Sequence, residues 1–103
     1  MITSKQRAYL RGLANLIEPI YQIGKAGLSP EVTEGISDAL EARELIKINV
    51  LKNCIEDPKE ISYILAERTR SDVVQQIGRK IVLYRPSKDN KTIELPLEKK
   101  RLK

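Results

Sequence analysis

The stretch IYQIGKAGLSPE, residues 20–31, contains the passage from strand to helix on which the fold depends. Its first four residues, a tyrosine and a glutamine between two isoleucines, are typical of a short strand. Gly24 and Gly27 then mark a turn. Ser29 and Pro30 indicate a helix start, because serine caps a helix N-terminus and proline fits its first turn. The stretch therefore predicts a strand, a glycine turn and a helix in succession.

The flanking elements follow from hydrophobic spacing and from capping residues. Thr3 and Gln6 match a capping box, and Asp57 precedes a proline at a second helix start. Apolar residues in 45–51 alternate as they do in a half-buried strand. The expected elements are a helix over 4–15, a strand over 20–23, a helix over 30–43, a strand over 45–51, a helix over 58–70 and strands over 72–77 and 80–85.

The order αβαβαββ predicts a single layered α/β domain over residues 2–96, with a mixed sheet of four strands. Gly78 and Arg79 suit a type II′ hairpin turn between the last two strands. Residues 92–95 are expected to form a short edge segment. Residues 97–103 carry four cations in the last five positions, and we expect a disordered basic tail there.

The composition excludes several classes of function. Among 103 residues there is no histidine and one cysteine, Cys54. Without histidine there can be no Ser-His-Asp or Cys-His arrangement and no His-based zinc site. Gly-x-Gly-x-x-Gly and P-loop motifs are also absent. We expect a protein that is not an enzyme and that uses no metal, cofactor or small-molecule substrate.

Nothing in the sequence indicates a membrane protein. The longest apolar runs, residues 63–66 and 81–84, have four residues each, whereas a membrane-spanning helix needs about 20. Residues 1–11 lack the apolar centre of a signal peptide. A soluble cytoplasmic protein is expected.

The positive charge is concentrated at the two ends of the chain. The net charge is +5 overall, with +3 in residues 1–29, −4 in residues 30–78 and +6 in residues 79–103. If the ends meet in the fold, they form a basic face opposite an acidic one, as in proteins that bind polyanions. A solvated surface with a basic tail is the other reading of the same pattern.

The loop from Gly24 to Gly27 is the candidate binding element. Two glycines let the backbone approach a ligand closely, and the following helix start offers N–H groups to a phosphate. Lys25 adds a charge at the tip. RNA-binding KH modules clamp a nucleic-acid backbone with a Gly-x-x-Gly loop, although many ordinary turns also carry two glycines.

Other candidates are cations on separate elements, although each of them taken alone is more often an ordinary solvated side chain. They are Lys5, Arg7 and Arg11 on the first helix, Arg79 and Lys80 at the hairpin, and Arg85 after the last core strand. Tyr84 is the best tyrosine for stacking on a base, because Arg85 follows it, although tyrosines at such spacing are more often buried.

Four stretches in order resemble the bacterial YhbY family, the stand-alone form of the CRM domain (chloroplast RNA splicing and ribosome maturation). They are LRGLA at 10–14, IGKAGL at 23–28, ELIK at 44–47 and IGRKIVLYRP at 77–86. The resemblance covers about residues 2–96. It implies an RNA-binding domain similar in fold to the C-terminal domain of bacterial translation initiation factor three.

The resemblance also implies a partner and a site. Members of this family associate with precursors of the large ribosomal subunit and are thought to assist their maturation. The family's proposed RNA contact corresponds to Gly24, Lys25, Ala26 and Gly27, and the resemblance implies that the basic residues of the first helix share that surface.

We therefore expect a non-catalytic protein that binds pre-ribosomal RNA of the large subunit. A rival hypothesis is a protein-interaction module whose acidic helix stripe docks a basic ribosomal protein. That stripe consists of Glu31, Glu34, Asp38 and Glu41. Binding of double-stranded DNA is a further alternative, and an enzyme is the least favoured class.

Overall fold

Three helices and four strands follow one another in the computed structural model, which describes residues 2–96. They are α1 (Ser4–Ala14), β1 (Pro19–Ile23), α2 (Pro30–Arg43), β2 (Leu45–Val50), α3 (Pro58–Thr69), β3 (Asp72–Ile77) and β4 (Lys80–Tyr84). Every element expected over residues 4–85 is present, with ends within one residue of the prediction. The tail expected at 97–103 lies outside the described residues.

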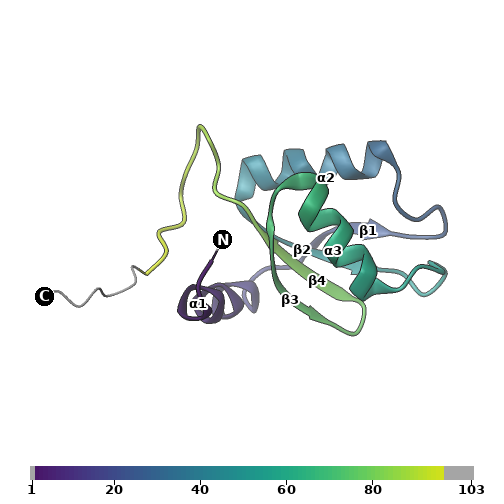
Figure 1. The fold of residues 1–103 in the computed structure, drawn as a ribbon, viewed down its shortest axis with the longest axis horizontal. Coiled ribbons are helices and arrows are strands. Elements are labelled where there is room, and N and C mark those ends of the chain that lie inside the picture. Colours follow the sequence, from purple (N-terminus) through teal and green to yellow (C-terminus); the bar gives the residue numbers. More distant parts are fainter. Residues whose placement is uncertain (1, 97–103) are drawn as a thin grey trace, which may run out of the picture.

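The four strands form one mixed sheet in the order β1-β2-β4-β3. β1 and β2 are parallel, while β4 is antiparallel to both β2 and β3. The predicted α/β class and mixed sheet are confirmed. Because β1 and β2 run the same way, the loops that follow them meet at one edge of the sheet, where the hairpin between β3 and β4 also lies (Figure 1).

The capping residues identified in the sequence start the three helices. Thr3 Oγ1 accepts the amide of Gln6 at 3.1 Å, and Gln6 Oε1 accepts the amide of Thr3 at 3.0 Å, which completes the capping box. Ser29 and Asp57 each accept an amide of the first turn at 3.2 Å. Each such cap stabilises its helix by about 1 kcal/mol.

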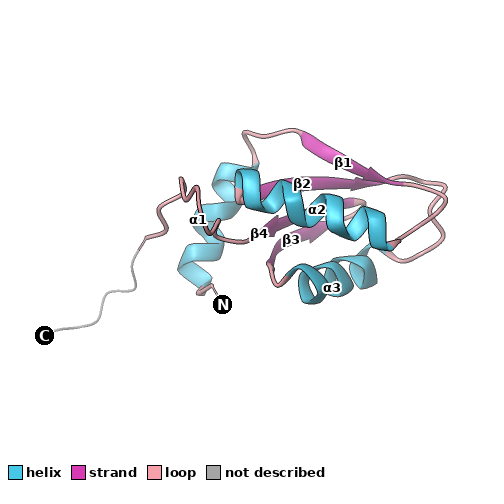
Figure 2. Ribbon diagram, turned by 90° about the horizontal axis from the view of Figure 1, so that it is seen from above, coloured by secondary structure: helices cyan, strands magenta, loops and turns pink. Residues whose placement is uncertain are grey.

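The sheet divides the core into two layers. α2 and α3 pack on one face over buried aliphatic side chains, among them Ile36, Leu40, Ile48, Leu65 and Ile81. α1 packs on the other face through Leu10 and Ala14. Figure 2 shows α1 lying across the strands at the end where β2 begins. α1 therefore covers a smaller part of its face of the sheet than α2 and α3 cover of the other face.

Glu44, which the sequence did not single out, is fully buried at the end of α2. Its carboxylate accepts the amides of Ser87 at 2.8 Å, Thr92 at 2.9 Å and Ile93 at 2.7 Å. The expectation of an edge segment over 92–95 is wrong, since these residues form no strand. Their first two amides donate to the Glu44 carboxylate, not to a neighbouring strand.

The hydrogen bonds to Glu44 also set its charge state. Burial raises the pKa of its carboxyl, but the amides of Ser87, Ile93 and Thr92 and the Thr92 hydroxyl outweigh that effect and hold the pKa below the ordinary value of about 4.5. An ionised carboxylate accepts hydrogen bonds more strongly than a protonated one. The ionised carboxylate of Glu44, at the end of α2, therefore holds residues 87–93 in place through hydrogen bonds.

Glu44→Gln is expected to lower the free energy of unfolding by about 1 to 3 kcal/mol, because an amide is a weaker acceptor and its NH2 group faces N–H donors. The contribution of Glu44 is present above pH 4.5 and is lost as the pH falls through its depressed folded-state pKa. Urea unfolding across this pH range measures both effects. Equal losses in Glu44→Gln and in Glu34→Gln, whose exposed side chain forms no hydrogen bond with other described residues, would contradict the assignment.

Candidate nucleic-acid interface

Three loops come together at one end of the sheet, which we call the loop end: residues 24–27, residues 51–57 and the hairpin at 78–79. The amide of Leu51 donates to the carbonyl of Ile23 at 2.8 Å, and Arg79 Nη1 donates to the carbonyl of Leu51 at 3.1 Å. These contacts join the first loop to the second, and the second to the hairpin. Segments far apart in the sequence thus share one surface.

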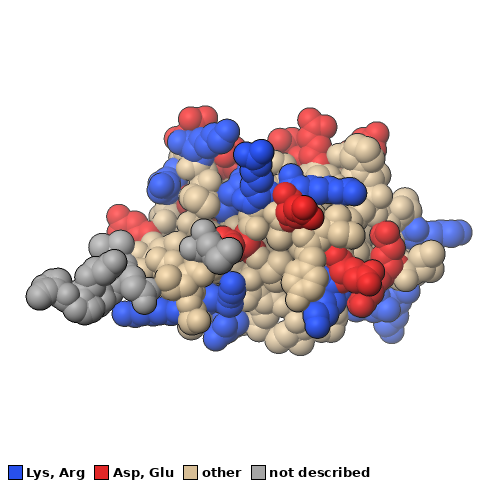
Figure 3. Space-filling model, viewed as in Figure 1, with Lys and Arg blue, Asp and Glu red and all other residues tan. Residues whose placement is uncertain are grey.

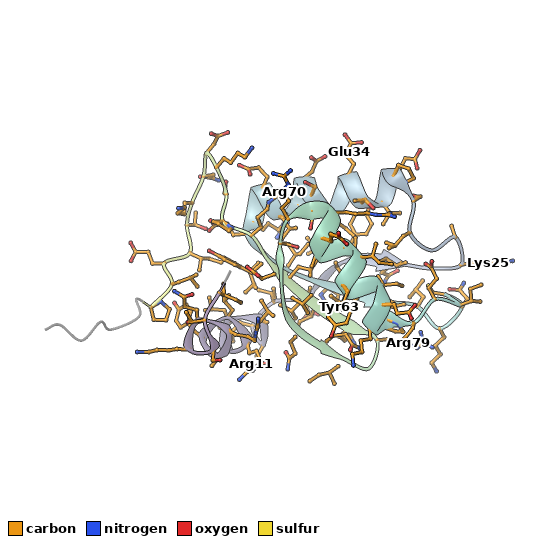
Figure 4. The ribbon with its side chains drawn as sticks, viewed as in Figure 1. Arg11, Lys25, Glu34, Tyr63, Arg70 and Arg79 are labelled. Atoms are coloured by element: carbon orange, nitrogen blue, oxygen red, sulfur yellow. The ribbon has the colours of Figure 1, made fainter. Side chains whose placement is uncertain are left out.

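Residues 24–27 form a tight turn, because the amide of Gly27 donates to the carbonyl of Gly24 at 2.9 Å. Gly27 has φ +70°, a conformation that favours glycine. A Cβ on Gly24 would lie 3.3 Å from the Leu51 side chain, so this glycine permits close packing of the two loops. Lys25 projects from the turn away from the body of the protein (Figure 4).

The start of α2 offers fewer N–H donors to an anion than the sequence suggests. Pro30 has no N–H, and Ser29 Oγ already accepts an amide of the first turn. Glu56 Oε1 accepts the amide of Leu28 at 3.2 Å. The amides of Lys25 and Ala26, in the middle of the glycine turn, form no hydrogen bond with other described residues. These two amides are therefore available as donors to a phosphate.

The loop end brings together Lys25, Arg79 and Lys80, three of the cations that the sequence selected. It also brings in Lys52, which is exposed in the adjoining loop and which the sequence reading missed. Lys52 could have been found from the parallel pairing of β1 and β2, because loops that follow parallel strands lie at the same end of the sheet. Glu56, Asp57 and Glu60 lie at the end of the loop 51–57 and just after it, and Figure 3 shows both signs of charge at the loop end.

The cations of α1 lie apart from the loop end, on the face that α1 covers. Lys5 and Arg11 are exposed, and Arg7 Nη1 lies 3.5 Å from the carbonyl of Val73. The first helix and the segment after β4 meet here, since Gln6 Nε2 donates to the carbonyl of Pro96 at 3.0 Å. The structure thus divides the predicted cations into two groups.

Arg85 belongs to neither group. It follows β4 at the end opposite the hairpin, about 16 Å from Lys80 along an extended strand. Its guanidinium donates to the carbonyl of Thr69 at 2.7 Å and to the carbonyl of Ser37 at 2.8 Å, and it lies 3.9 Å from Glu41. These contacts connect α2, α3 and β4, so we leave Arg85 out of the proposed interface.

Tyr84 is unsuited to stacking on a base, because it is only 3% exposed. It packs in the α1 layer, where burial, with Glu44 and Asp72 nearby, raises the pKa of its hydroxyl. The more accessible tyrosines are Tyr63 on α3, 57% exposed, and Tyr9 on α1, 44% exposed. The preference for Tyr84 in the sequence analysis was therefore wrong.

The acidic stripe lies on α2, on the opposite side of the sheet from α1. Figure 3 shows red side chains along the upper rim over α2. Glu41 is not simply solvated, because it accepts the Ser87 hydroxyl at 2.7 Å and the Lys88 amide at 3.1 Å. The hydrogen bond from Ser87 and then that from Lys88 hold the pKa of Glu41 below its usual range. At least one member of the stripe therefore has a structural role.

Arg85→Lys is expected to lower the free energy of unfolding by about 1 to 3 kcal/mol, because lysine cannot reproduce the forked contacts to Ser37 and Thr69. Arg79→Lys, an equivalent change at the exposed hairpin, is expected to be nearly neutral. Chemical denaturation of both variants measures the difference. An unchanged midpoint for Arg85→Lys would show that the guanidinium does not connect the elements.

Residues 2–96 also bear on two other kinds of site. No helix there is long and apolar enough to cross a membrane. In the same part of the chain, no group of three His, Cys, Asp or Glu side chains is placed to hold a metal ion.

Sequence comparison identifies a known family. A sequence model of the CRS1 / YhbY (CRM) domain matches residues 2–85. The chain is 50% identical over 96 residues to "Probable RNA-binding protein YqeI" of Bacillus subtilis, a match that covers 93% of this chain and 100% of that protein. It is 38% identical over 95 residues to an "RNA-binding protein" of Haemophilus influenzae, covering 92% of this chain and 95% of the relative.

Structural comparison gives the same grouping. The fold is similar to the solution structure of the hypothetical protein SAV1595 from Staphylococcus aureus, with a TM-score of 0.78 and 55% sequence identity. The match covers 93% of this chain and 100% of that one. The likeness therefore extends over nearly the whole described fold.

Proposed function

Because the chain belongs to the CRS1 / YhbY (CRM) domain family, we propose that it is a non-catalytic, cytoplasmic RNA-binding protein. Its RNA is the ribosomal RNA of large-subunit precursors, and binding assists the maturation of that subunit. The resemblance noted in four sequence motifs is confirmed by the family match. The names of the relatives from Bacillus subtilis and Haemophilus influenzae support RNA as the ligand.

The observation that carries the proposal is the glycine turn with Lys25 at its tip and further cations beside it. The turn gives RNA phosphates access to two amides that form no hydrogen bond within residues 2–96, and Lys25 supplies a charge next to them. Arg79 and Lys52 extend the positive surface across the neighbouring loops. A backbone-directed contact of this kind binds RNA without requiring a particular base.

Binding is expected to depend steeply on salt. If about five phosphates of a single-stranded segment are neutralised, the logarithm of the affinity falls with the logarithm of the salt concentration at a slope of roughly −3.5. Fluorescence anisotropy with a labelled single-stranded RNA over a salt series measures this slope. A slope near zero would remove the electrostatic basis of the proposal.

Gly24→Asp is expected to weaken RNA binding strongly while the fold persists. Gly24 does not need a positive φ, and a new Cβ meets only mobile side-chain atoms of Leu51 and Asn53, at 3.3 and 3.5 Å. The added carboxylate repels phosphate at the turn. Anisotropy gives the affinity and circular dichroism the fold.

Gly24→Ala is the matched variant without the charge, and it should lose much less affinity than Gly24→Asp. Global unfolding of Gly24→Asp would show that the turn is needed for the fold, and unchanged RNA affinity in a folded variant would remove the turn from the interface.

The acidic stripe of α2 offers a second reading, in which a basic ribosomal protein docks there. Reversing the charge of Glu34, which points outward from α2 in Figure 4, separates the two readings. Loss of ribosome association with RNA affinity unchanged would favour the protein-docking reading.

A further inference from the structure

α1 leaves part of its own face of the sheet uncovered. It packs on the end of the sheet where β2 begins, over Leu45, Val82 and Tyr84. Beyond these residues, toward the loop end, side chains on the same face are exposed or half-buried. Ile77 shows this most clearly, because it is a large apolar residue with 64% of its surface exposed.

The strand register identifies the residues of this uncovered region. Lys80 of β4 lies opposite Asn49 on β2 and opposite Ile77 on β3. Residues directly opposite one another share a face of the sheet. We call the region the open sheet face; its members are Gln22, Asn49, Ile77 and Lys80, together with the half-buried Lys47 and Gln75, which lie opposite Val82 at its border with α1.

The side chains of the open sheet face suit RNA. It carries two lysines and three side-chain amides, and the strand segments 20–23, 47–50, 75–77 and 80–82 contain no acidic residue. This absence contrasts with the acidic stripe on the other side of the sheet. Lysines neutralise phosphates, and side-chain amides can donate to and accept from base edges and 2′-hydroxyls.

The position of the open sheet face links the two groups of cations. Lys80 joins it to the hairpin at the loop end, and α1, the helix that carries Arg7 and Arg11, borders its other end. A strand of RNA that contacts both groups along this side of the protein has to cross the face between them. The separation of the two groups is thereby explained.

We propose that the open sheet face binds a single-stranded segment of RNA between the loop end and α1. Lys47 and Lys80 contact phosphates, while Asn49 and its amide neighbours hydrogen-bond to bases or sugars, and Ile77 packs against a base. This inference rests on the proposed RNA-binding function and extends it to a surface that the sequence analysis did not identify as a whole.

Lys47→Gln tests the inference, with an unstructured single-stranded RNA of mixed sequence as the probe. Loss of one phosphate contact is expected to weaken binding about fivefold near 0.1 M salt and to flatten the log–log salt slope by about 0.7. Asn49→Asp, a change of nearly equal volume within the same face and outside the loop end, adds a charge that repels phosphate, so it should also weaken binding and keeps the test open if Lys47→Gln folds poorly. Lys91→Gln removes the same charge from the segment after β4 and should change affinity much less.

The outcomes separate this inference from the proposed function. Weakening by Lys25→Gln with wild-type affinity in folded Lys47→Gln and Asn49→Asp would overturn the inference and leave RNA binding at the loop end. Absence of any RNA binding by the wild-type protein would overturn both. If Lys47→Gln instead dissociates a dimer in analytical ultracentrifugation with RNA affinity unchanged, the face is a contact between copies of the chain, and the inference is wrong.

Discussion

The parallel pairing of β1 with β2 is the constraint on which the arrangement of the proposed RNA-binding surface depends. It aligns Ile23 with Val50, and the backbone continues this alignment when the Leu51 amide donates to Ile23. The glycine turn and the following loop consequently emerge side by side, and antiparallel β4 adds the hairpin. Without this register, Lys25 and Arg79 would lie on unrelated parts of the surface.

The helices and strands could be predicted because local signals specify them. Caps at Thr3, Ser29 and Asp57 and alternating apolar residues act within a few positions. The course of residues 86–96 could not be predicted in this way. It depends on the Glu44 carboxylate, which reaches amides 43 to 49 positions away in the chain. An acid at a helix end is usually solvated, so nothing local marked it as buried.

The candidate site was predictable in part for the same reason. The glycine turn is local, and the structure shows it between β1 and α2 as expected. Which cations lie together depends on the tertiary fold. In the fold Arg85 is hydrogen-bonded between α2 and α3, and Lys52 lies at the loop end. The open sheet face depends on α1 covering only one end of the sheet, which periodicity does not reveal.

The most direct test of the account is sedimentation of a lysate through a sucrose gradient, with detection of the wild-type protein and of Lys25→Glu. The account predicts that the wild-type protein comigrates with large-subunit particles at low salt and that Lys25→Glu remains at the top of the gradient although it is folded. Wild-type protein found only at the top, or comigration that Lys25→Glu leaves unchanged, would contradict the claim that the loop end binds ribosomal RNA.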